Sequence, residues 1–378
     1  MLLRTLKLTS VRNLAPLTLE PGPRFTVFSG ENGQGKTNLL EAVYAVCTLR
    51  SFRTRRLADL IAFGASSAYL AAEVDRAGSV RTYELTLEPA SRKVRLDGKA
   101  VRPLSRYFGG FQVVLFAPED LAVARASPGE RRAFLDRAVF QRTPEYLGEA
   151  QSYDKVLRTR NAVLRTLRER GTTSASAGGL LEVYDQQLAE LAARRMARRA
   201  GLVAELRPRF QLAFEAIGRA DRPAGLAYAP QVPGASEALG DEAALAGRMM
   251  QALASARPAD LARAVTTVGP HRDDLELLLG DRPAAAFASQ GQLRAMVLAW
   301  KIAEMEILAE AHGHVPILLL DDVSSELDPR RNEYLFEFLS SKGAQCMVTT
   351  THPRHVLATG DRVDFEVRSG VVTRQNSG

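Results

Sequence analysis

A glycine-rich segment near the start of the chain has the residue types and the spacing of a phosphate-binding loop. Residues 30–37 read GENGQGKT and match the pattern G-x-x-x-x-G-K-[ST] at every position. Glycines let the backbone curl so that its N–H groups converge on phosphate oxygens. The pattern predicts that Lys36 reaches the β- and γ-phosphates of a nucleotide and that the Thr37 hydroxyl binds Mg²⁺. The rest of the loop would help to bind the nucleotide: Gly30, Glu31, Asn32, Gly33, Gln34 and Gly35.

Two adjacent carboxylates follow a run of four aliphatic residues late in the chain. Residues 317–320 read as a buried strand, which places Asp321 at a carboxyl end, where open α/β sheets bind ligands. Asp321 would hold Mg²⁺ directly or through water, and Asp322 could orient or deprotonate an attacking water. The pattern alone also fits a strand that runs into a polar loop. Together with the phosphate-binding loop, it favours a site that hydrolyses a nucleotide.

A second helix start could also bind an anion. Residues 289–292 read SQGQ and immediately precede an amphipathic helix expected at 293–311. Ser289 suits the N-cap position, and the first turn carries free N–H groups. A plain capped helix is one interpretation. The other is that Ser289, Gln290, Gly291 and Gln292 bind the phosphates of a nucleotide held by another subunit.

A phosphate-binding loop needs a strand before it and a helix after it, and the sequence offers both. Residues 25–28 form a short apolar run, and residues 38–46 suit an apolar helix. A chance match on a glycine-rich turn is the alternative, and these flanking elements argue against it.

The hydrophobic pattern changes twice along the chain. The first third alternates apolar and polar residues, which predicts strands and turns. Residues 129–218 have apolar residues at helical spacing, with a flexible connection expected at 171–179 and a loop at 221–240. The strand-and-helix pattern returns at about residue 264. The sequence therefore predicts an α/β fold of residues 1–122 and 264–378 with an inserted α-helical lobe, residues 123–263.

Composition limits the class of protein. The chain is 46% hydrophobic and 25% charged, which excludes wholesale disorder and a fibrous repeat. The start of the chain lacks the apolar core of a secretory signal, and no stretch has the length of a membrane span. Two cysteines cannot form a disulfide framework, so we expect a reduced, cytoplasmic protein that does not bind membranes.

The net charge of +7 is modest, and its distribution says more about partners. Residues 50–56, RSFRTRR, carry four arginines and no acid. Arg53, Arg55 and Arg56 are therefore candidate contacts to nucleic-acid phosphates. Two further arginine-rich stretches, 158–170 and 194–209, have acids interleaved. They suit either a solvated helix face or a second basic surface.

The order of these motifs resembles the head of an ABC-type ATPase. Ser325-Glu326-Leu327-Asp328 resembles the D-loop that follows the acidic strand end in that superfamily. Within it, the chain resembles the RecF family of bacterial DNA replication and repair proteins, in the SMC-like branch. The resemblance covers nearly the whole length, through GENGQGKTNLLEAVY (30–44), RSFRTRRLADLI (50–61), LFAPEDL (115–121), PGERRAFLD (128–136), VGPHRDDLEL (268–277), SQGQLRAMVLAWKIAE (289–304) and LLLDDVSSELD (318–328).

The resemblance implies a fold, a reaction and partners. It implies an ABC-type head, with a mixed sheet and flanking helices, that binds ATP and Mg²⁺ through residues 30–37 and Asp321. Residues 289–292 would contact the nucleotide of a partner subunit, Asp322 would be the catalytic carboxylate, and Asp328 would stabilise the dimer. RecF-like proteins dimerise on ATP, bind DNA at single-strand gaps and junctions, and act with RecO and RecR to load RecA. Slow hydrolysis would serve as a release switch.

Four further features concern single residues or short segments of the family pattern. Asp322 stands where many ABC proteins carry Glu, and its shorter side chain suits a slow switch. His352 lies near the switch histidine of ABC transport ATPases, but it also suits a plain loop. Residues 271–274, HRDD, match the family without a chemical role that follows from their types. Arg12 and Asn13 would lie near the nucleotide by the same resemblance.

Three alternatives share some of these motifs. A nucleotide-binding subunit of an ABC transporter shares the phosphate-binding loop and the acidic strand end, but it lacks a long arginine-rich lobe. A clamp that binds ATP without turnover is disfavoured by the complete set of Lys36, Thr37, Asp321 and Asp322. A head with a long coiled coil is disfavoured by the length of the chain.

Overall fold

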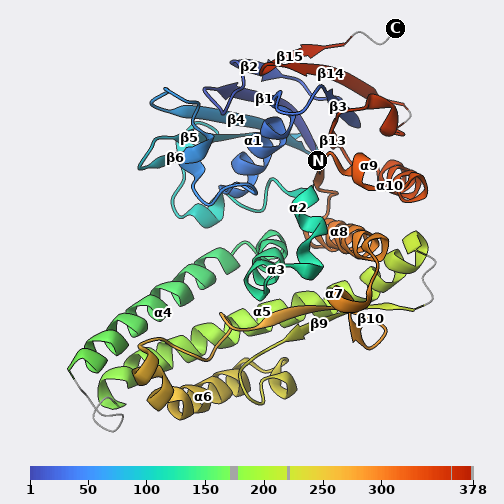
Figure 1. Ribbon diagram of the computed structural model, residues 1–378. Helices are drawn as coiled ribbons and strands as arrows, with labels where there is room; N and C mark the ends of the chain where they lie inside the picture. Colours follow the sequence, from blue (N-terminus) through green and yellow to red (C-terminus); the bar gives the residue numbers. More distant parts are fainter. Residues whose placement is uncertain (171–177, 219–221, 359, 376–378) are drawn as a thin grey trace. The chain divides into compact units, whose positions relative to one another are not determined.

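The computed structural model describes residues 1–170, 178–218, 222–358 and 360–375, and these residues divide into two compact units (Figure 1). The first unit comprises Met1–Leu121 and Val297–Gly378, and the second comprises Ala122–Met296. The second unit is thus inserted into the sequence of the first. The flexible connection predicted at 171–179 lies outside the described residues, except for the two glycines that begin α5.

The first unit contains two six-stranded sheets. One has the order β15-β14-β3-β13-β12-β8, in which every neighbouring pair is parallel except β14 and β15. The other is fully antiparallel and has the order β2-β1-β4-β5-β6-β7. The parallel strands are β3 (Phe25–Ser29), β8 (Val113–Phe116), β12 (Ile317–Asp321), β13 (Cys346–Thr350) and β14 (Arg362–Arg368), with β15 (Val371–Arg374) at the edge. The antiparallel strands are β1 (Leu2–Thr9), β2 (Leu17–Leu19), β4 (Ala68–Arg76), β5 (Ser79–Leu87), β6 (Arg92–Leu96) and β7 (Lys99–Ala100).

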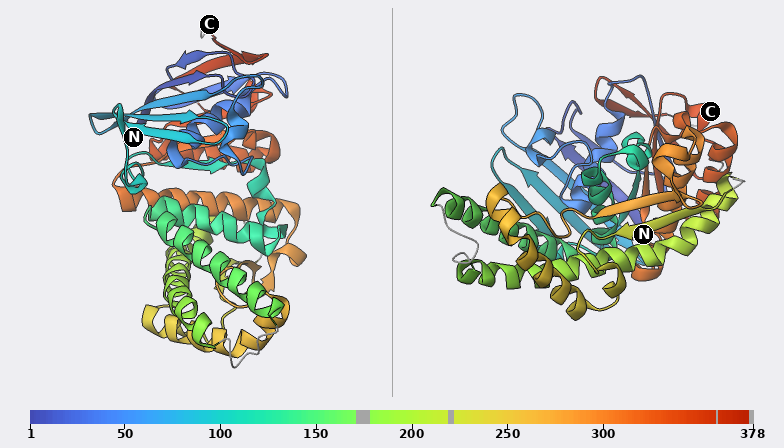
Figure 2. Two further views of the ribbon diagram at one scale, coloured as in Figure 1. Left: turned by 90° about the vertical axis from the view of Figure 1, so that its left-hand side faces the viewer. Right: turned by 60° about the horizontal axis from the view of Figure 1, so that its bottom comes forward.

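Helix α1 (Lys36–Thr48) lies between these two sheets (Figures 1 and 2). Its side chains from Leu39 to Thr48 are all buried, because the helix packs against a sheet on each side. A helix that is apolar all round has this environment. The other helices of this unit are η1 (Leu57–Leu60), η2 (Leu104–Arg106), α2 (Pro118–Leu121), α9 (Val323–Glu326), α10 (Pro329–Lys342) and η5 (Pro353–His355). The division between the units falls inside α8 (Gln290–His312).

The second unit is built mainly of long helices. In it α4, α5 and α6 run side by side (Figures 1 and 2). Its helices are η3 (Val123–Arg125), α3 (Pro128–Arg142), α4 (Tyr146–Glu169), α5 (Gly178–Gly218), η4 (Ser236–Ala238), α6 (Glu242–Arg263) and α7 (Ala284–Phe287). A small antiparallel sheet of β9 (Ala224–Ala229), β10 (Asp274–Leu279) and β11 (Arg282–Pro283) accompanies them.

This small sheet contains a strand that the sequence did not predict. The loop expected at 221–240 is wrong for Ala224–Ala229, which pair with all of β10. Ala224, Leu226 and Tyr228 are buried, but their alternation is weak because small residues separate them and prolines and glycines flank them. Residues 264–296 fall within the second unit, whereas the sequence suggested that they belong with the ATPase fold.

Two arginine-rich stretches place side chains inside the second unit. Arg160 is fully buried and bonds to Asp185 and Asp260, at 2.6 and 2.7 Å. Arg195 and Arg199 both pair with Asp136, at 2.9 and 2.7 Å. These three guanidinium groups are neither a solvated helix face nor a basic surface. They tie α3, α4, α5 and α6 together, and such pairs keep a buried charge compensated.

The 271–274 segment belongs to the same interior. The His271 ring bonds to the Tyr153 hydroxyl at 2.7 Å and to the Thr266 carbonyl at 3.1 Å. Burial lowers the pKa of His271 to about 4, so the ring is neutral at pH 7. Asp273 accepts hydrogen bonds from the Tyr228 hydroxyl and from the backbone N–H of Gln231. The geometry gives this segment a structural role.

None of the described helices combines the length and the apolar character that a membrane span requires.

Candidate nucleotide-binding site

The phosphate-binding loop connects the end of β3 to the start of α1, as the sequence predicted. Gly30, Gly33 and Gly35 adopt φ values of 151°, 80° and 113°, which favour glycine. A Cβ atom on Gly30 would lie 2.3 Å from the Val367 carbonyl oxygen, and one on Gly35 would lie 2.8 Å from the Asn13 side-chain oxygen. The positive φ and the close neighbours together require glycine at both positions.

Lys36 places its ammonium group within the curl of the loop. Its Nζ donates hydrogen bonds to the carbonyl oxygens of Gly30 and Glu31, at 2.7 and 2.8 Å. Burial lowers the pKa of Lys36, while the charges of Asp322 and Asp321 oppose that shift. Both carboxylates are thus close enough to act on the lysine electrostatically. A phosphate group would offer the same ammonium a stronger, charged acceptor.

The acidic strand end meets the start of α1. Asp321, at the end of β12, accepts hydrogen bonds through the same carboxylate oxygen from the hydroxyls of Thr37 and Thr349, at 2.8 and 2.7 Å. The parallel pairing of β12 with β13 brings Asp321 opposite Thr349. Residues 284 positions apart in the sequence are therefore joined at one point.

Asp322 continues this strand end in a strained conformation. Its φ of 49° is left-handed, which costs a non-glycine residue about 1 kcal/mol or more. Its backbone N–H donates to the carbonyl and to the hydroxyl of Thr349, at 3.1 and 3.0 Å. The turn breaks the alternation of the strand, so that two consecutive carboxylates act on Lys36.

The oxygen donors at this point suit Mg²⁺. A hydroxyl and a carboxylate are hard ligands, and Mg²⁺ usually takes only one or two protein oxygens and completes its shell with water and phosphate. Thr37 and Asp321 supply two such oxygens within hydrogen-bonding distance of each other. Across the described ranges, no cluster of three or more His, Cys, Asp or Glu side chains is arranged to hold a metal. The donor set fits a cation bound together with a nucleotide.

Several residues that the motif does not include support the loop. The Asn13 side chain donates to the Gly33 carbonyl at 3.3 Å and accepts from the Asn38 side chain at 2.7 Å. The resemblance had placed Asn13 near the nucleotide, and the structure places it against the loop. The turn between β14 and β15 also contacts the loop, because Gly370 donates its N–H to the carbonyl of Gln34 at 2.9 Å. No sequence signal indicated that contact.

The SQGQ segment begins α8. Ser289 Oγ accepts from the Gln292 backbone N–H at 3.2 Å, and the Gln292 side chain accepts from the Ser289 N–H at 2.8 Å. This reciprocal pair is a capping box. Ser289 and Gln290 are exposed, so the start of this long helix is accessible. The capped-helix interpretation therefore holds, and it leaves an exposed helix N-terminus of the kind that binds anions.

Asp328 also caps a helix. Its carboxylate accepts from the Arg331 backbone N–H at 3.2 Å at the start of α10, and it pairs with the Arg331 side chain. Burial alone would raise the pKa of Asp328, but the hydrogen bonds and the charge of Arg331 hold it below its usual value. Asp328 is therefore charged at neutral pH. Its side chain is 42% exposed.

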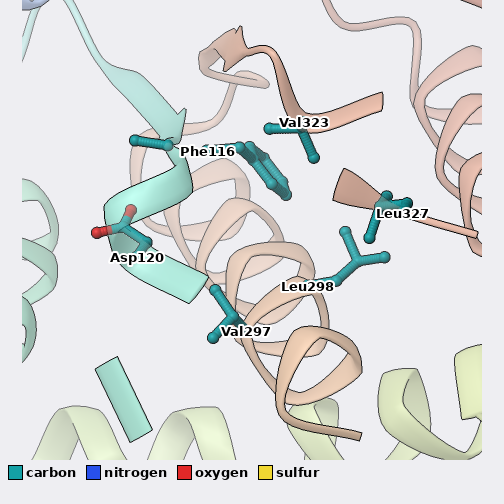
Figure 3. Close-up of a pocket in the computed structure, with 7 residues that line it drawn as sticks. Phe116, Asp120, Val297, Leu298, Val323 and Leu327 are labelled. Carbon is teal, nitrogen blue, oxygen red and sulfur yellow. The ribbon is translucent and has the colours of Figure 1, made fainter. Parts of the chain in front are cut away.

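A small apolar hollow lies beside the segment that joins Asp322 to Asp328 (Figure 3). Val323 and Leu327 of that segment face Val297 and Leu298 of α8 across it. The remaining lining residues come from the end of β8 and from α2: Phe116, Ala117 and Asp120. The hollow marks where the segment after the acidic strand end packs on α8, and its apolar lining offers little to a nucleotide.

The other candidate residues lie in different environments. Arg53 donates to the Asn38 side chain at 2.8 Å, so it is tied to α1. Arg55 and Arg56 are exposed, and Arg56 lies 3.9 Å from Asp59. His352 is exposed, and its ring lies beside the His355 ring, with centroids 5.2 Å apart.

Comparisons with known proteins agree with this geometry. Residues 2–373 match the family model described as RecF/RecN/SMC N terminal domain. The DNA replication and repair protein RecF of Myxococcus xanthus (strain DK1622) is 44% identical over 374 residues, which are 98% of this chain and 97% of that protein. The RecF of Anaeromyxobacter dehalogenans (strain 2CP-C) is 46% identical over 379 residues, 99% of each chain.

Solved structures give the same result for the fold. The chain is similar to the recombination mediator protein RecF solved with ATP in the RecFOR pathway, with a TM-score of 0.90 and 29% identity over 99% of this chain and 97% of that chain. It also resembles an SMC head bound to the C-winged helix domain of ScpA in fold alone, with a TM-score of 0.55 and 15% identity. The predicted ABC-type head fold and the predicted family resemblance are confirmed, and the transporter alternative is not favoured.

Proposed function

This chain belongs to the RecF family, and on that premise we propose that it is an ATP-dependent DNA-binding protein of gap repair. It would dimerise on ATP, bind DNA at gaps and junctions, and act with RecO and RecR to promote RecA loading on single-stranded DNA. The observation that carries the ATP-dependent part is the contact between Thr37 and Asp321 beside the Lys36 ammonium. The similarity to the ATP-bound recombination mediator protein RecF of the RecFOR pathway supports the repair part.

In the proposed reaction, residues 30–37 bind the phosphates. Lys36 exchanges its two carbonyl acceptors for phosphate oxygens, and the N–H groups at the start of α1 face the same charge. Thr37 and Asp321 would hold Mg²⁺. When bound, Mg²⁺ supplies positive charge that neutralises the charge developing on the transferred phosphoryl group.

Asp322 would orient the attacking water as a general base. Its carboxylate is one methylene shorter than a glutamate, and its backbone is fixed by two hydrogen bonds from its N–H to Thr349. A short, rigid base that only partly reaches the water gives slow turnover. Slow hydrolysis suits a switch that holds a dimer on DNA and then releases it.

The dimer would place the SQGQ segment of each subunit on the nucleotide of the other. Ser289 and Gln290 are exposed at a capped helix start, which can accept an anion held by the other subunit. Asp328, charged and partly exposed, would contribute to the same interface. DNA would then bind mostly through its phosphates to exposed arginines such as Arg55 and Arg56.

We also place the protein in a reducing, cytoplasmic compartment. Both cysteines, Cys47 and Cys346, are buried free thiols, and burial raises the pKa of each, which keeps them unreactive.

The decisive test is the oligomeric state measured by light scattering, with and without ATP and Mg²⁺. Wild type is expected to double its mass with ATP. Ser289→Arg should stay monomeric, because the long arginine side chain blocks the start of α8. Ser127→Arg is the matched control. Ser127 caps α3 with the same kind of capping box, so its loss costs a comparable amount of about 1 kcal/mol without touching the SQGQ segment.

Two results would contradict the proposal. If Ser289→Arg dimerises like wild type, the segment does not act across the dimer. If wild type stays monomeric while calorimetry shows ATP bound, ATP does not drive dimerisation.

A further inference from the structure

A buried carboxylate lies behind the phosphate-binding loop and takes no part in the reaction proposed above. Glu41, in the middle of α1, is completely buried. Its two carboxylate oxygens accept hydrogen bonds from Nε and Nη2 of Arg12, at 3.0 and 2.9 Å. The Ser51 hydroxyl donates to one of them, and a guanidinium nitrogen of Arg53 lies 3.7 Å from the other. A buried charge is stable only when it is paired, and here two arginines share one carboxylate.

One of these arginines fixes the chain beside the phosphate-binding loop. Arg12 has a left-handed φ of 52°, and its N–H donates to the Leu60 carbonyl at 2.8 Å. A non-glycine residue keeps this conformation only when its surroundings enforce it. The next residue, Asn13, bonds to the Gly33 carbonyl and lies against Gly35. The position of Arg12 on Glu41 therefore sets the position of a side chain that touches the loop.

The other arginine belongs to the 50–56 segment. Ser51 Oγ accepts hydrogen bonds from the N–H groups of Arg53 and Thr54, at 2.9 and 3.0 Å. The same hydroxyl donates to Glu41, so it connects this turn to the buried carboxylate. Arg53 also donates to Asn38, whose side-chain N–H₂ group donates to Asn13. These contacts form one continuous network of hydrogen bonds and ion pairs. The network connects the 50–56 segment, through Glu41 and α1, to the phosphate-binding loop.

The two arginines are not held equally. Arg12 makes a bidentate contact with the Glu41 carboxylate, and its side chain is 24% exposed. Arg53 lies farther from the carboxylate, and its side chain is 41% exposed. Two positive charges on one negative charge leave an excess of +1. A phosphate group of DNA can therefore compete for Arg53 more easily than for Arg12.

We propose that Glu41 is a positioning residue that couples DNA contact at the 50–56 segment to the phosphate-binding loop through its shared hold on Arg12 and Arg53. When Arg53 turns to a DNA phosphate, Glu41 is left to Arg12 alone, and the Asn13 and Asn38 contacts to the loop change with it. By reciprocity, nucleotide in the loop alters how readily Arg53 leaves Glu41. This inference rests on the proposed function, because it needs both ATP and DNA to bind.

The experiment measures the ratio of DNA dissociation constants with ADP and with a slowly hydrolysed ATP analogue. A fluorescent oligonucleotide that carries a single-strand to double-strand junction is the probe, and anisotropy is the readout. Wild type is expected to bind DNA more tightly with the ATP analogue, and a coupling of typical size gives a ratio of about 5 to 150. Glu41→Gln keeps the shape and removes the charge, and its ratio should fall several-fold below that of wild type, because dimerisation still contributes to the ratio whereas the coupling through Arg53 does not. The ratio cancels any equal loss of affinity in both states, so a purely structural defect does not change it.

Three further variants make the result specific. Arg53→Gln leaves the pair of Glu41 and Arg12 intact, and it should lower the ratio by the same factor as Glu41→Gln. The double variant should be no worse than either single one, because both act through one contact. Glu304→Gln is the matched control, since Glu304 is a buried helix carboxylate that pairs with Lys301 at 3.3 Å. It should keep the wild-type ratio.

The outcomes separate the inference from the proposed function. A wild-type ratio of 1 would contradict ATP-dependent DNA binding itself, and the coupling with it. A wild-type ratio well above 1 that Glu41→Gln retains would overturn the inference alone. If Glu41→Gln does not fold, Arg53→Gln decides: a folded Arg53→Gln protein with the wild-type ratio overturns the coupling.

Discussion

Single residues at the nucleotide site owe their geometry to backbone conformations that their side chains do not favour. Arg12 and Asp322 both have left-handed φ values of about 50°, and each is held by hydrogen bonds from its own N–H. One carboxylate oxygen of Asp321 accepts two hydroxyl groups at once. Strain of this kind persists only where surrounding contacts compensate it, and it is concentrated at functional sites.

His271 gives a prediction at this scale. Its pKa is lowered by burial to about 4, whereas an unfolded histidine has its usual pKa of 6.5. The unfolded chain therefore takes up a proton between these values and the folded chain does not, so stability falls as the pH falls from 6.5 to 4. At pH 5 this loss reaches up to about 2 kcal/mol relative to pH 7. Urea denaturation of His271→Gln at both pH values should show a loss smaller by that amount.

The control for this prediction is His352→Gln, at an exposed histidine. This variant should keep the full acid sensitivity of wild type. If His271→Gln keeps it as well, the ring is not the group responsible.

At the scale of elements, the phosphate-binding loop depends on segments far away in the sequence. The turn between β14 and β15 binds Gln34 through two N–H groups, those of Gly370 and Ser369, at 2.9 and 2.5 Å. The parallel pairing of β14 with β3 brings this turn next to the loop. The shape of the loop is therefore a property of the sheet as well as of its own glycines.

Gly370→Ala tests this support. Gly370 has a φ of 80°, and a Cβ atom there would lie 1.9 Å from the Asn13 carbonyl oxygen. The turn must shift away from the loop, and we expect a loss of stability of about 2 kcal/mol. Nucleotide affinity, measured by calorimetry, should fall about tenfold, which corresponds to about 1.4 kcal/mol.

Gly98→Ala is the matched control for that experiment. Gly98 has a similar φ of 73°, but its Cβ atom would meet no other atom within 4 Å. This variant carries the conformational strain alone, so it should bind nucleotide like wild type. Equal nucleotide affinity in both variants would show that the turn does not support the loop.

At the scale of the whole molecule, a net charge of +7 favours polyanions without specifying a sequence. The structure reduces the number of arginines available for this purpose, because Arg160, Arg195 and Arg199 are buried and pair with aspartates of the second unit. Arg55 and Arg56 remain exposed. DNA affinity in the presence of ATP should therefore fall steeply with salt.

The salt dependence provides the prediction at this scale. Each lost phosphate contact lowers the slope of log affinity against log salt by about 1. We expect this change for Arg55→Ala, measured by anisotropy with ATP at several salt concentrations. Arg95→Ala, at an exposed arginine of β6, is the control and should keep the wild-type slope. An unchanged slope in Arg55→Ala would exclude Arg55 as a DNA contact.

The amino-acid sequence by itself determined the parts of this protein whose signals are local. The glycines and Lys36 of the phosphate-binding loop, the aliphatic strand before Asp321 and the Ser289 cap each reflect interactions within a few residues. Backbone sterics and capping depend on near neighbours, so spacing alone predicted them.

Only the tertiary structure decided which distant groups meet. The bonds of Asp321 to Thr37 and Thr349, and the turn at Gly370 against the loop, depend on strand order in the parallel sheet. The arginine-rich stretches suited either a solvated helix face or a basic surface, yet Arg160, Arg195 and Arg199 pair with carboxylates from other helices. Charge is compensated by whichever opposite charge lies nearest in space, and a sequence does not state those distances until packing brings the elements together.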